Sequence, residues 1–219
     1  MDLFLNKLAL GCLQTIFIMR RQIFKFNIKK QAEIDLAVEK AVAVLKKGGI
    51  VVHPTDTCYG IAADMSSKRA INKVYKFKGR DFNNPFFIIV KDINQFKQYG
   101  SWNKLAQEMI KQDPGKMFTF VVSRKKTVPN YLNPDFPTVG IQTPKNRFSL
   151  TLLKKFGSPV IGTSANIFSQ PVVYSIKDLL TQLKKAGRYP DLILDGGRLP
   201  HKRPSSVVAI KGKNIKILR

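Results

Sequence analysis

Apolar residues recur along this chain at the spacings of amphipathic helices and short strands. Across residues 33–47 they return every three or four positions, which predicts a helix with one buried face. Gly48 and Gly49 follow and supply its C-terminal stop. Residues 50–53 are then mostly β-branched, which predicts a strand. Pro54 is expected to end that strand, because proline lacks the amide that a ladder needs.

The same signals continue to the end of the chain. Ser66 or Ser67 can cap a helix that carries a buried apolar stripe and stops at Gly79. Short apolar runs bounded by Pro, Asn or Gly predict the strands 59–63, 86–90, 118–122, 139–141, 160–163, 192–194, 207–210 and 215–218. Further helices are expected at 105–112, 148–156 and 176–185. Strands that alternate irregularly with helices predict an α/β fold with a mixed sheet.

The length of 219 residues fits one domain, which we expect to occupy residues 27–219. Residues 1–26 are expected to be an extension outside that domain. Their apolar run is interrupted by polar residues and falls short of the roughly 20 apolar residues that span a bilayer. We therefore expect no membrane attachment.

The chain is strongly basic, with 38 Lys and Arg against 14 Asp and Glu. Such a surplus attracts polyanions, including RNA, nucleotides and acidic lipid headgroups. The alternative is a lysine-rich composition with no dedicated partner, since many of the positive charges lie singly along helices. Cys12 and Cys58 form no CxxC or His/Cys cluster, so no zinc site is expected and a reducing cytoplasm suits the chain.

Four segments carry candidate chemistry. Residues 53–60 read H-P-T-D-T-C-Y-G and place two hydroxyls and an acid between two strands. Residues 76–80, K-F-K-G-R, bring a lysine and an arginine to a helix end, where both suit phosphate or carboxylate. Residues 162–166, G-T-S-A-N, follow a strand, and residues 204–208, P-S-S-V-V, enter one.

Each segment also has a purely structural interpretation. The polar residues of 53–60 and 162–166 can satisfy turns, and cations at a helix C-terminus are favourable without any ligand. Neither a P-loop nor a G-x-G-x-x-G motif occurs in the sequence. Any ATP site must therefore be built in another way.

In their order, the four segments resemble the YrdC/Sua5/TsaC family of L-threonylcarbamoyladenylate synthases. Its members carry P-T-[DE]-T-x-Y-G, K-x-R, S-x-N and S-T-V-V, and the resemblance covers roughly residues 33–219. It implies a YrdC-like twisted mixed β-sheet with flanking helices around a basic cavity. It also implies that L-threonine, bicarbonate and ATP, with Mg²⁺, give threonylcarbamoyl-adenylate. A downstream transferase then modifies tRNA in the cytoplasm, and this chain resembles the short form of the family.

The resemblance also implies roles for individual residues. Lys78 and Arg80 would be catalytic and hold phosphates. The nucleotide would further contact Asn84, Thr138, Ser164, Asn166 and Arg219, and the amino acid would contact Thr55, Thr57 and Ser205. No protein metal ligand is singled out, although Asp56 is a candidate.

Two departures from the family pattern concern the amino acid. Ile89 stands where many relatives have histidine, and Gln142 stands where they have arginine. They keep open a related carbamoyl-adenylate enzyme with a different acceptor. The basic charge keeps open an RNA-binding or ribosome-associated module, which would need stacking aromatics beside basic residues.

Overall fold

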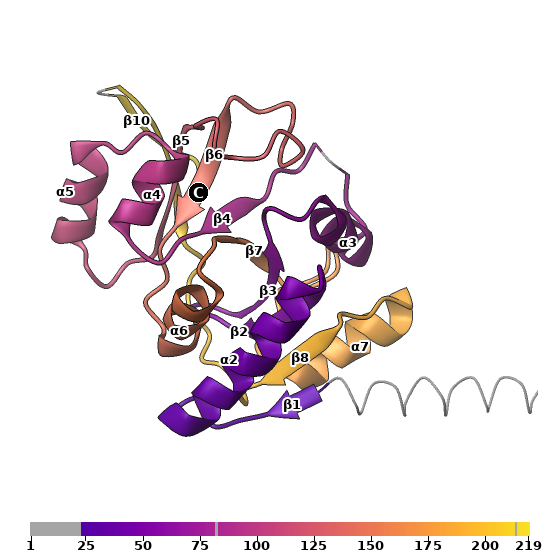
Figure 1. Cartoon of the computed structure of the whole chain (residues 1–219). Coiled ribbons are helices and arrows are strands. Elements are labelled where there is room, and N and C mark those ends of the chain that lie inside the picture. The colour runs from indigo at the N-terminus through magenta and orange to yellow at the C-terminus, as the bar shows by residue number, and fades with distance from the viewer. Residues whose placement is uncertain (1–22, 82, 213) are drawn as a thin grey trace, which may run out of the picture.

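The computed structural model describes residues 23–81, 83–212 and 214–219 (Figure 1). Its centre is a ten-stranded mixed sheet with the strand order β1-β8-β2-β3-β7-β4-β6-β5-β9-β10. Neighbours are parallel in the pairs β1/β8, β8/β2, β4/β6 and β5/β9, and antiparallel in the other five pairs. The expected α/β fold with a mixed sheet is confirmed.

The strands are short and follow the predicted runs closely. They are β1 Ile23–Lys25, β2 Ile50–Pro54, β3 Tyr59–Asp64, β4 Phe87–Ile89, β5 Phe118–Ser123, β6 Thr138–Gln142, β7 Val160–Ser164, β8 Leu192–Asp195, β9 Ser206–Lys211 and β10 Asn214–Ile217. The described helices are α2 Gln31–Lys46, α3 Lys68–Lys78, α4 Ile93–Tyr99, α5 Lys104–Gln112, α6 Arg147–Phe156 and α7 Ile176–Ala186. Among these helices, none is long and apolar enough to cross a bilayer.

The helices cover the two faces of the sheet unequally. Apolar residues of α3, α4, α5 and α7 pack into one core with alternate residues of the strands, such as Val52, Ile61 and Ile161. Helices α2 and α6 pack into a second core on the opposite face, with Val51 and Ala62 (Figure 1). This alternation is the period-two pattern of a sheet buried on both faces.

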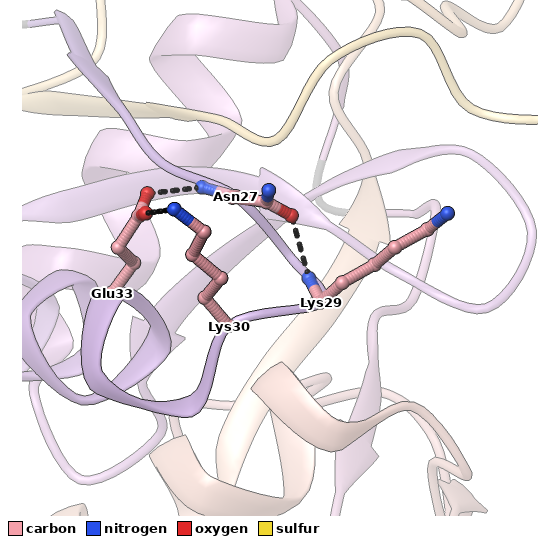
Figure 2. A network of polar contacts seen from close by, with 4 residues as sticks. All are labelled: Asn27, Lys29, Lys30 and Glu33. Atoms are coloured by element: carbon pink, nitrogen blue, oxygen red, sulfur yellow. Dashed lines mark hydrogen bonds and ion pairs between the residues drawn. The ribbon is translucent and has the colours of Figure 1, made fainter.

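Polar contacts fix the start of α2, as Figure 2 shows. The Glu33 carboxylate accepts a hydrogen bond from the Asn27 amide at 2.7 Å and pairs with the Lys30 ammonium at 3.3 Å. The Asn27 side chain accepts from the Lys29 amide at 2.9 Å, which closes an Asx-type turn. A carboxylate in the first turn also complements the helix dipole.

Caps account for most of the agreement at helix ends. Ser67 caps α3 by accepting from the Ala70 amide, and Gly79 ends α3 with φ 67°, in the left-handed region.

The structure differs from expectation at three places. Strand β2 includes Pro54, which pairs with Tyr59 at the strand terminus, so its missing amide ends the ladder rather than interrupting it. Helix α4 was not predicted, because it spans only seven residues.

The third difference concerns the start of the sheet. Strand β1 lies before Asn27 and pairs in parallel with β8 through Ile23, Phe24 and Lys25. The sheet therefore begins ahead of the expected domain boundary at residue 27. The rest of the expected N-terminal extension, residues 1–22, lies outside the described residues.

Candidate active site

A cavity of about 540 Å³ lies on the sheet face that also carries α2 and α6. Its floor follows alternate residues of neighbouring strands, among which Gly162, Phe87 and Gly140 form one row in register. Glycine is needed at this point of the floor, because the Ile89 side chain packs directly against it and a Cβ on Gly162 would come within 2.6 Å of Ile89 Cδ1. Gly60 lies in a neighbouring row, between His53 and Ser164.

One wall comes from the loop that joins β5 and β6. The Arg124 guanidinium donates to five backbone carbonyls of this loop, those of Val128, Pro129, Leu132, Asn133 and Phe136. The Asn133 side chain both donates to and accepts from the backbone of Phe86. The loop is thereby tied to the segment before β4, and Asn133 and Phe136 line the cavity.

The charges around the cavity are mainly positive. The described lining residues include Lys78, Arg80, Lys202 and Arg219 against the one acid Asp56. The expected basic cavity is confirmed, and it suits a ligand that carries several negative charges.

Lys78 joins two of the segments that the sequence singled out. It is 2% exposed, and its Nζ donates to the carbonyl oxygens of Ser164 at 2.8 Å and Asn166 at 2.7 Å. It also lies 3.2 Å from Asn166 Oδ1. Burial, and then the nearby Arg80 charge, lower the pKa of Lys78 to about 7. The ammonium is therefore poised near neutral pH and fixed at the cavity wall.

Arg80 follows the αL residue that ends α3. Its Nη2 donates to the carbonyl oxygens of Asn84 at 2.8 Å and Pro85 at 3.1 Å, and its guanidinium lies 4.1 Å from the ring centroid of Phe86. Its Nε is buried and has no hydrogen-bond partner. Burial lowers the pKa of this guanidinium, which still stays charged at neutral pH because arginine does not deprotonate in proteins.

The two threonines of the 53–60 segment differ in how much hydrogen-bonding capacity their hydroxyls retain. Thr55 Oγ1 donates to the Cys58 carbonyl at 2.6 Å and accepts from the amides of Thr57 and Cys58. This hydroxyl has used its donor and both lone pairs, so it organises the turn. Thr57 Oγ1 has only long contacts, at 3.5 Å to Thr55 Oγ1 and 3.9 Å to Cys58 Sγ. Thr57 is therefore the hydroxyl available to a ligand.

A second cluster of polar side chains lies on β5, on β6 and just before β9. Thr119 Oγ1 lies 3.0 Å from Ser205 Oγ and 3.5 Å from Gln142 Oε1. Arg219 Nη2 donates to the Ser205 carbonyl at 3.4 Å. Gln142 and its register partner Ile89 are both uncharged, so Arg219 supplies the charge at this point.

Asp56 has a structural role in the described contacts. Its Oδ2 accepts from the Lys145 amide at 3.1 Å and from Asn146 Nδ2 at 2.9 Å, and Asn146 caps α6. Within the described parts of the chain, no group of three or more His, Cys, Asp or Glu side chains could hold a metal ion.

Nine of the ten residues that the resemblance assigned to substrates line this one cavity. They are Thr55, Thr57, Lys78, Arg80, Thr138, Ser164, Asn166, Ser205 and Arg219. Asn84 is not among the described lining residues, and its backbone carbonyl instead accepts from Arg80. The individual roles stay predictions.

Sequence reasoning assigned no role to three other residues of the lining. Thr119 lies in an apolar run, and Lys202 lies in a basic loop two residues before the 204–208 segment. His53 opens the 53–60 segment, but it was given only as the last residue of the predicted strand 50–53.

A family model for the Sua5/YciO/YrdC domain, described as Telomere recombination, matches residues 43–219. That match covers most of the chain. The chain belongs to the Sua5/YciO/YrdC family.

Two relatives in the Sua5/YciO/YrdC family show how the chain compares in length. A protein of Methanocaldococcus jannaschii is 32% identical over 205 residues, which cover 92% of this chain and 93% of that protein. Threonylcarbamoyl-AMP synthase of Rattus norvegicus is 34% identical over 164 residues, which cover 74% of this chain and 56% of that enzyme. The chain thus spans little more than half the length of the rat enzyme.

A solved structure supports the same fold. Sua5 of P. abyssi, in complex with L-threonine, superposes with a TM-score of 0.79 at 23% identity. The match covers 90% of this chain and 56% of the P. abyssi protein. At that identity the likeness establishes the Sua5/YciO/YrdC fold.

Proposed function

We propose that this chain is an L-threonylcarbamoyladenylate synthase. It would convert L-threonine, bicarbonate and ATP into threonylcarbamoyl-AMP, pyrophosphate and water. The observation that carries this proposal is the buried Lys78 ammonium beside Arg80 in a cavity with four cations and one acid. The rat relative's name and the match of the family model to residues 43–219 support the same activity.

The reaction joins two anions, and this explains the need for the cations. A carboxylate oxygen of N-carboxy-threonine forms a bond to the α-phosphorus of ATP, and the bond from that phosphorus to the bridging oxygen of pyrophosphate breaks. Both reactants are negative, so fixed positive groups are needed to bring them together and to stabilise charge at the phosphorus. Lys78 supplies a held ammonium, and Arg80 supplies a donor at Nε that no protein group uses.

The amino acid would occupy the part of the cavity between Thr57 and the Thr119–Ser205 pair. The Thr57 hydroxyl has only long contacts, and Ser205 lies beside the Arg219 guanidinium. Hydroxyls orient oxygens without adding negative charge, which suits a site that already holds a triphosphate. Gln142 and Ile89 add no charge at this end, so Arg219 beside Ser205 is the cation nearest to that pair.

Mg²⁺ would be held mainly by the phosphates of ATP and by water, as Mg²⁺ commonly is in nucleotide sites. It would supply neutralisation of phosphate charge. The residues that adjoin those phosphates in this proposal are Lys78 and Arg80. Asp56 is engaged with the start of α6 through one carboxylate oxygen.

The product would pass to a downstream transferase that acts on tRNA in the cytoplasm. Direct contact between this chain and tRNA stays a prediction. The test of the proposed activity is product formation that requires all three substrates, read by mass spectrometry. Pyrophosphate release that proceeds without bicarbonate or L-threonine would point to a different acceptor.

A further inference from the structure

Two cavity-lining residues have a buried side-chain polar atom with no partner. Within the described parts of the chain, Arg80 Nε and His53 Nε2 are the two such atoms. A buried polar atom without a partner is costly, so each needs an explanation. The Arg80 donor is explained by a phosphate. His53 has no place in the reaction described so far.

The hydrogen bonding of His53 defines what its free nitrogen can do. Nδ1 lies 3.0 Å from the Pro54 carbonyl oxygen, which can only accept, so Nδ1 carries the proton. Nε2 is then a lone-pair acceptor. Burial lowers the pKa of His53 to about 4, so the ring stays neutral at physiological pH. A ligand group that meets Nε2 must therefore donate.

His53 lies at the start of the turn that carries Thr57, the hydroxyl proposed for the amino acid. Its ring lies 5.4 Å from that of Phe148, and Gly60 is its register partner on β3. A Cβ built on Gly60 would lie 4.0 Å from His53 Nε2 and 2.7 Å from the methyl group of Thr55. The space beside Nε2 is thus narrow. A group that meets Nε2 must therefore be small, such as an amine, and a purine ring is too wide.

The local charge favours an amine over a hydroxyl. Asp56, three residues along the chain, is close enough that its carboxylate favours positive charge on the His53 ring. The same carboxylate favours positive charge on a ligand group in front of that ring. Four of the five charged groups of the cavity are cations, so this is the part of the wall best suited to an ammonium or amine.

We propose that His53 Nε2 accepts a hydrogen bond from the α-amine of the amino-acid substrate and so positions that nitrogen for carboxylation. This inference rests on the proposed synthase function. It assigns a residue that distinguishes an amine-bearing substrate from an analogue without one. It also gives a hydrogen-bond partner to the buried His53 Nε2, which has none within the described structure.

Nitrogen NMR of the wild-type protein tests this contact directly. The chain has two histidines, His53 and His201, so ¹⁵N-histidine spectra are simple, and His201→Asn assigns them. With a non-hydrolysable ATP analogue present, L-threonine and L-2-aminobutyrate should both shift the His53 Nε2 resonance upfield. 3-Hydroxybutyrate, which lacks the amine, and the ATP analogue alone should leave it in place.

The other outcomes of this titration overturn the proposal. A shift with the ATP analogue alone would make His53 a nucleotide contact. A shift only with ligands that carry the hydroxyl would assign the contact to that group. No shift with L-threonine, while the wild type still forms product, would leave the synthase function standing and remove His53 from it. No product from the wild type would instead count against the synthase function.

Kinetics of two variants give a second readout. His53→Phe keeps the ring volume but loses the acceptor, and it should raise the KM for L-threonine about tenfold while the KM for ATP stays within about twofold. His53→Gln restores an acceptor oxygen and should recover part of the loss. Equal effects on both KM values, with no recovery by Gln, would indicate a purely structural residue and overturn the proposal.

Discussion

Lys78 Nζ lies 2.7 Å from the carbonyl oxygen of Asn166, which is 88 residues further along the chain. This contact joins the end of α3 to the loop that follows β7. The Asn166 side chain extends the connection, because its Nδ2 donates to the carbonyls of Ile167 and Gln170. One ammonium therefore holds together two of the segments that resemble the family motifs.

Replacement of Lys78 by methionine should remove the charge and keep the volume. Because the ammonium is needed to hold two anions together, we expect adenylate formation to fall by about 10²–10³-fold. The fold should persist with reduced stability, since methionine suits a buried site but the carbonyls of Ser164 and Asn166 lose their donor. Lys76→Met, on the exposed side of the same helix, is the matched control and should keep wild-type activity. Near-normal turnover by a folded Lys78→Met protein would contradict the assigned role.

The lowered pKa of Lys78 predicts that nucleotide affinity depends on pH. The free protein binds the Lys78 proton with a pKa of about 7, and a bound triphosphate raises that pKa by favouring the ammonium. ATP binding should then take up a proton, and affinity should fall by up to tenfold per pH unit above about pH 7. Calorimetry across pH 6–9 measures this dependence.

The Lys78→Met variant is also the control for that pH series. It has no ammonium to titrate, so its weaker affinity should vary much less with pH. An equal slope in the wild type and the variant would mean that another group, or the nucleotide itself, titrates in this range.

His53 predicts a loss of stability in acid. Its folded pKa of about 4 lies below the unfolded value of about 6.5, so between these pH values the unfolded chain binds more protons. Stability from this group is present above about pH 6.5 and is lost as the pH falls to about 4, by roughly 3 kcal/mol. Urea unfolding of the wild type and of His53→Phe should show a shallower acid decline in the variant. Parallel declines would contradict this prediction.

The glycine floor predicts a coupled pair of substitutions. A Cβ on Gly162 would approach Ile89 Cδ1 within 2.6 Å and Phe87 Cε2 within 2.8 Å. Gly162→Ala alone should cost about 1–3 kcal/mol through overpacking. In a protein that already carries Ile89→Ala, which makes room, Gly162→Ala should cost less than it does alone. The coupling free energy between the two substitutions should exceed about 0.5 kcal/mol. Additive costs would show that the floor relaxes elsewhere.

The sequence pattern was sufficient for most of the fold, for identifiable reasons. Helix α3 has both a serine cap and a left-handed glycine stop, and the strands are apolar runs with clear breaks. Strand β1 carried no such signal, because its three residues are stabilised by β8, which lies far along the chain. Its existence depends on a long-range pairing that local periodicity does not contain.

The site was predictable as a set of residues but not as an arrangement. The resemblance named ten residues, nine of which line one cavity, yet the contact between Lys78 and Asn166 depends on β3 and β7 being neighbours in the sheet. The motif treated Thr55 and Thr57 alike, and only their hydrogen bonds separate a saturated hydroxyl from a free one. The orphan acceptor on His53 likewise follows from burial and from the Pro54 carbonyl, which no spacing rule reports.

Mass spectrometry of reactions that contain ATP, L-threonine and bicarbonate, with each omitted in turn, decides whether the protein is a threonylcarbamoyl-AMP synthase. We expect threonylcarbamoyl-AMP in the full mixture, none when any one substrate is omitted, and almost none with Lys78→Met. Folded wild-type protein that binds ATP but makes no such product would contradict the proposed synthase function.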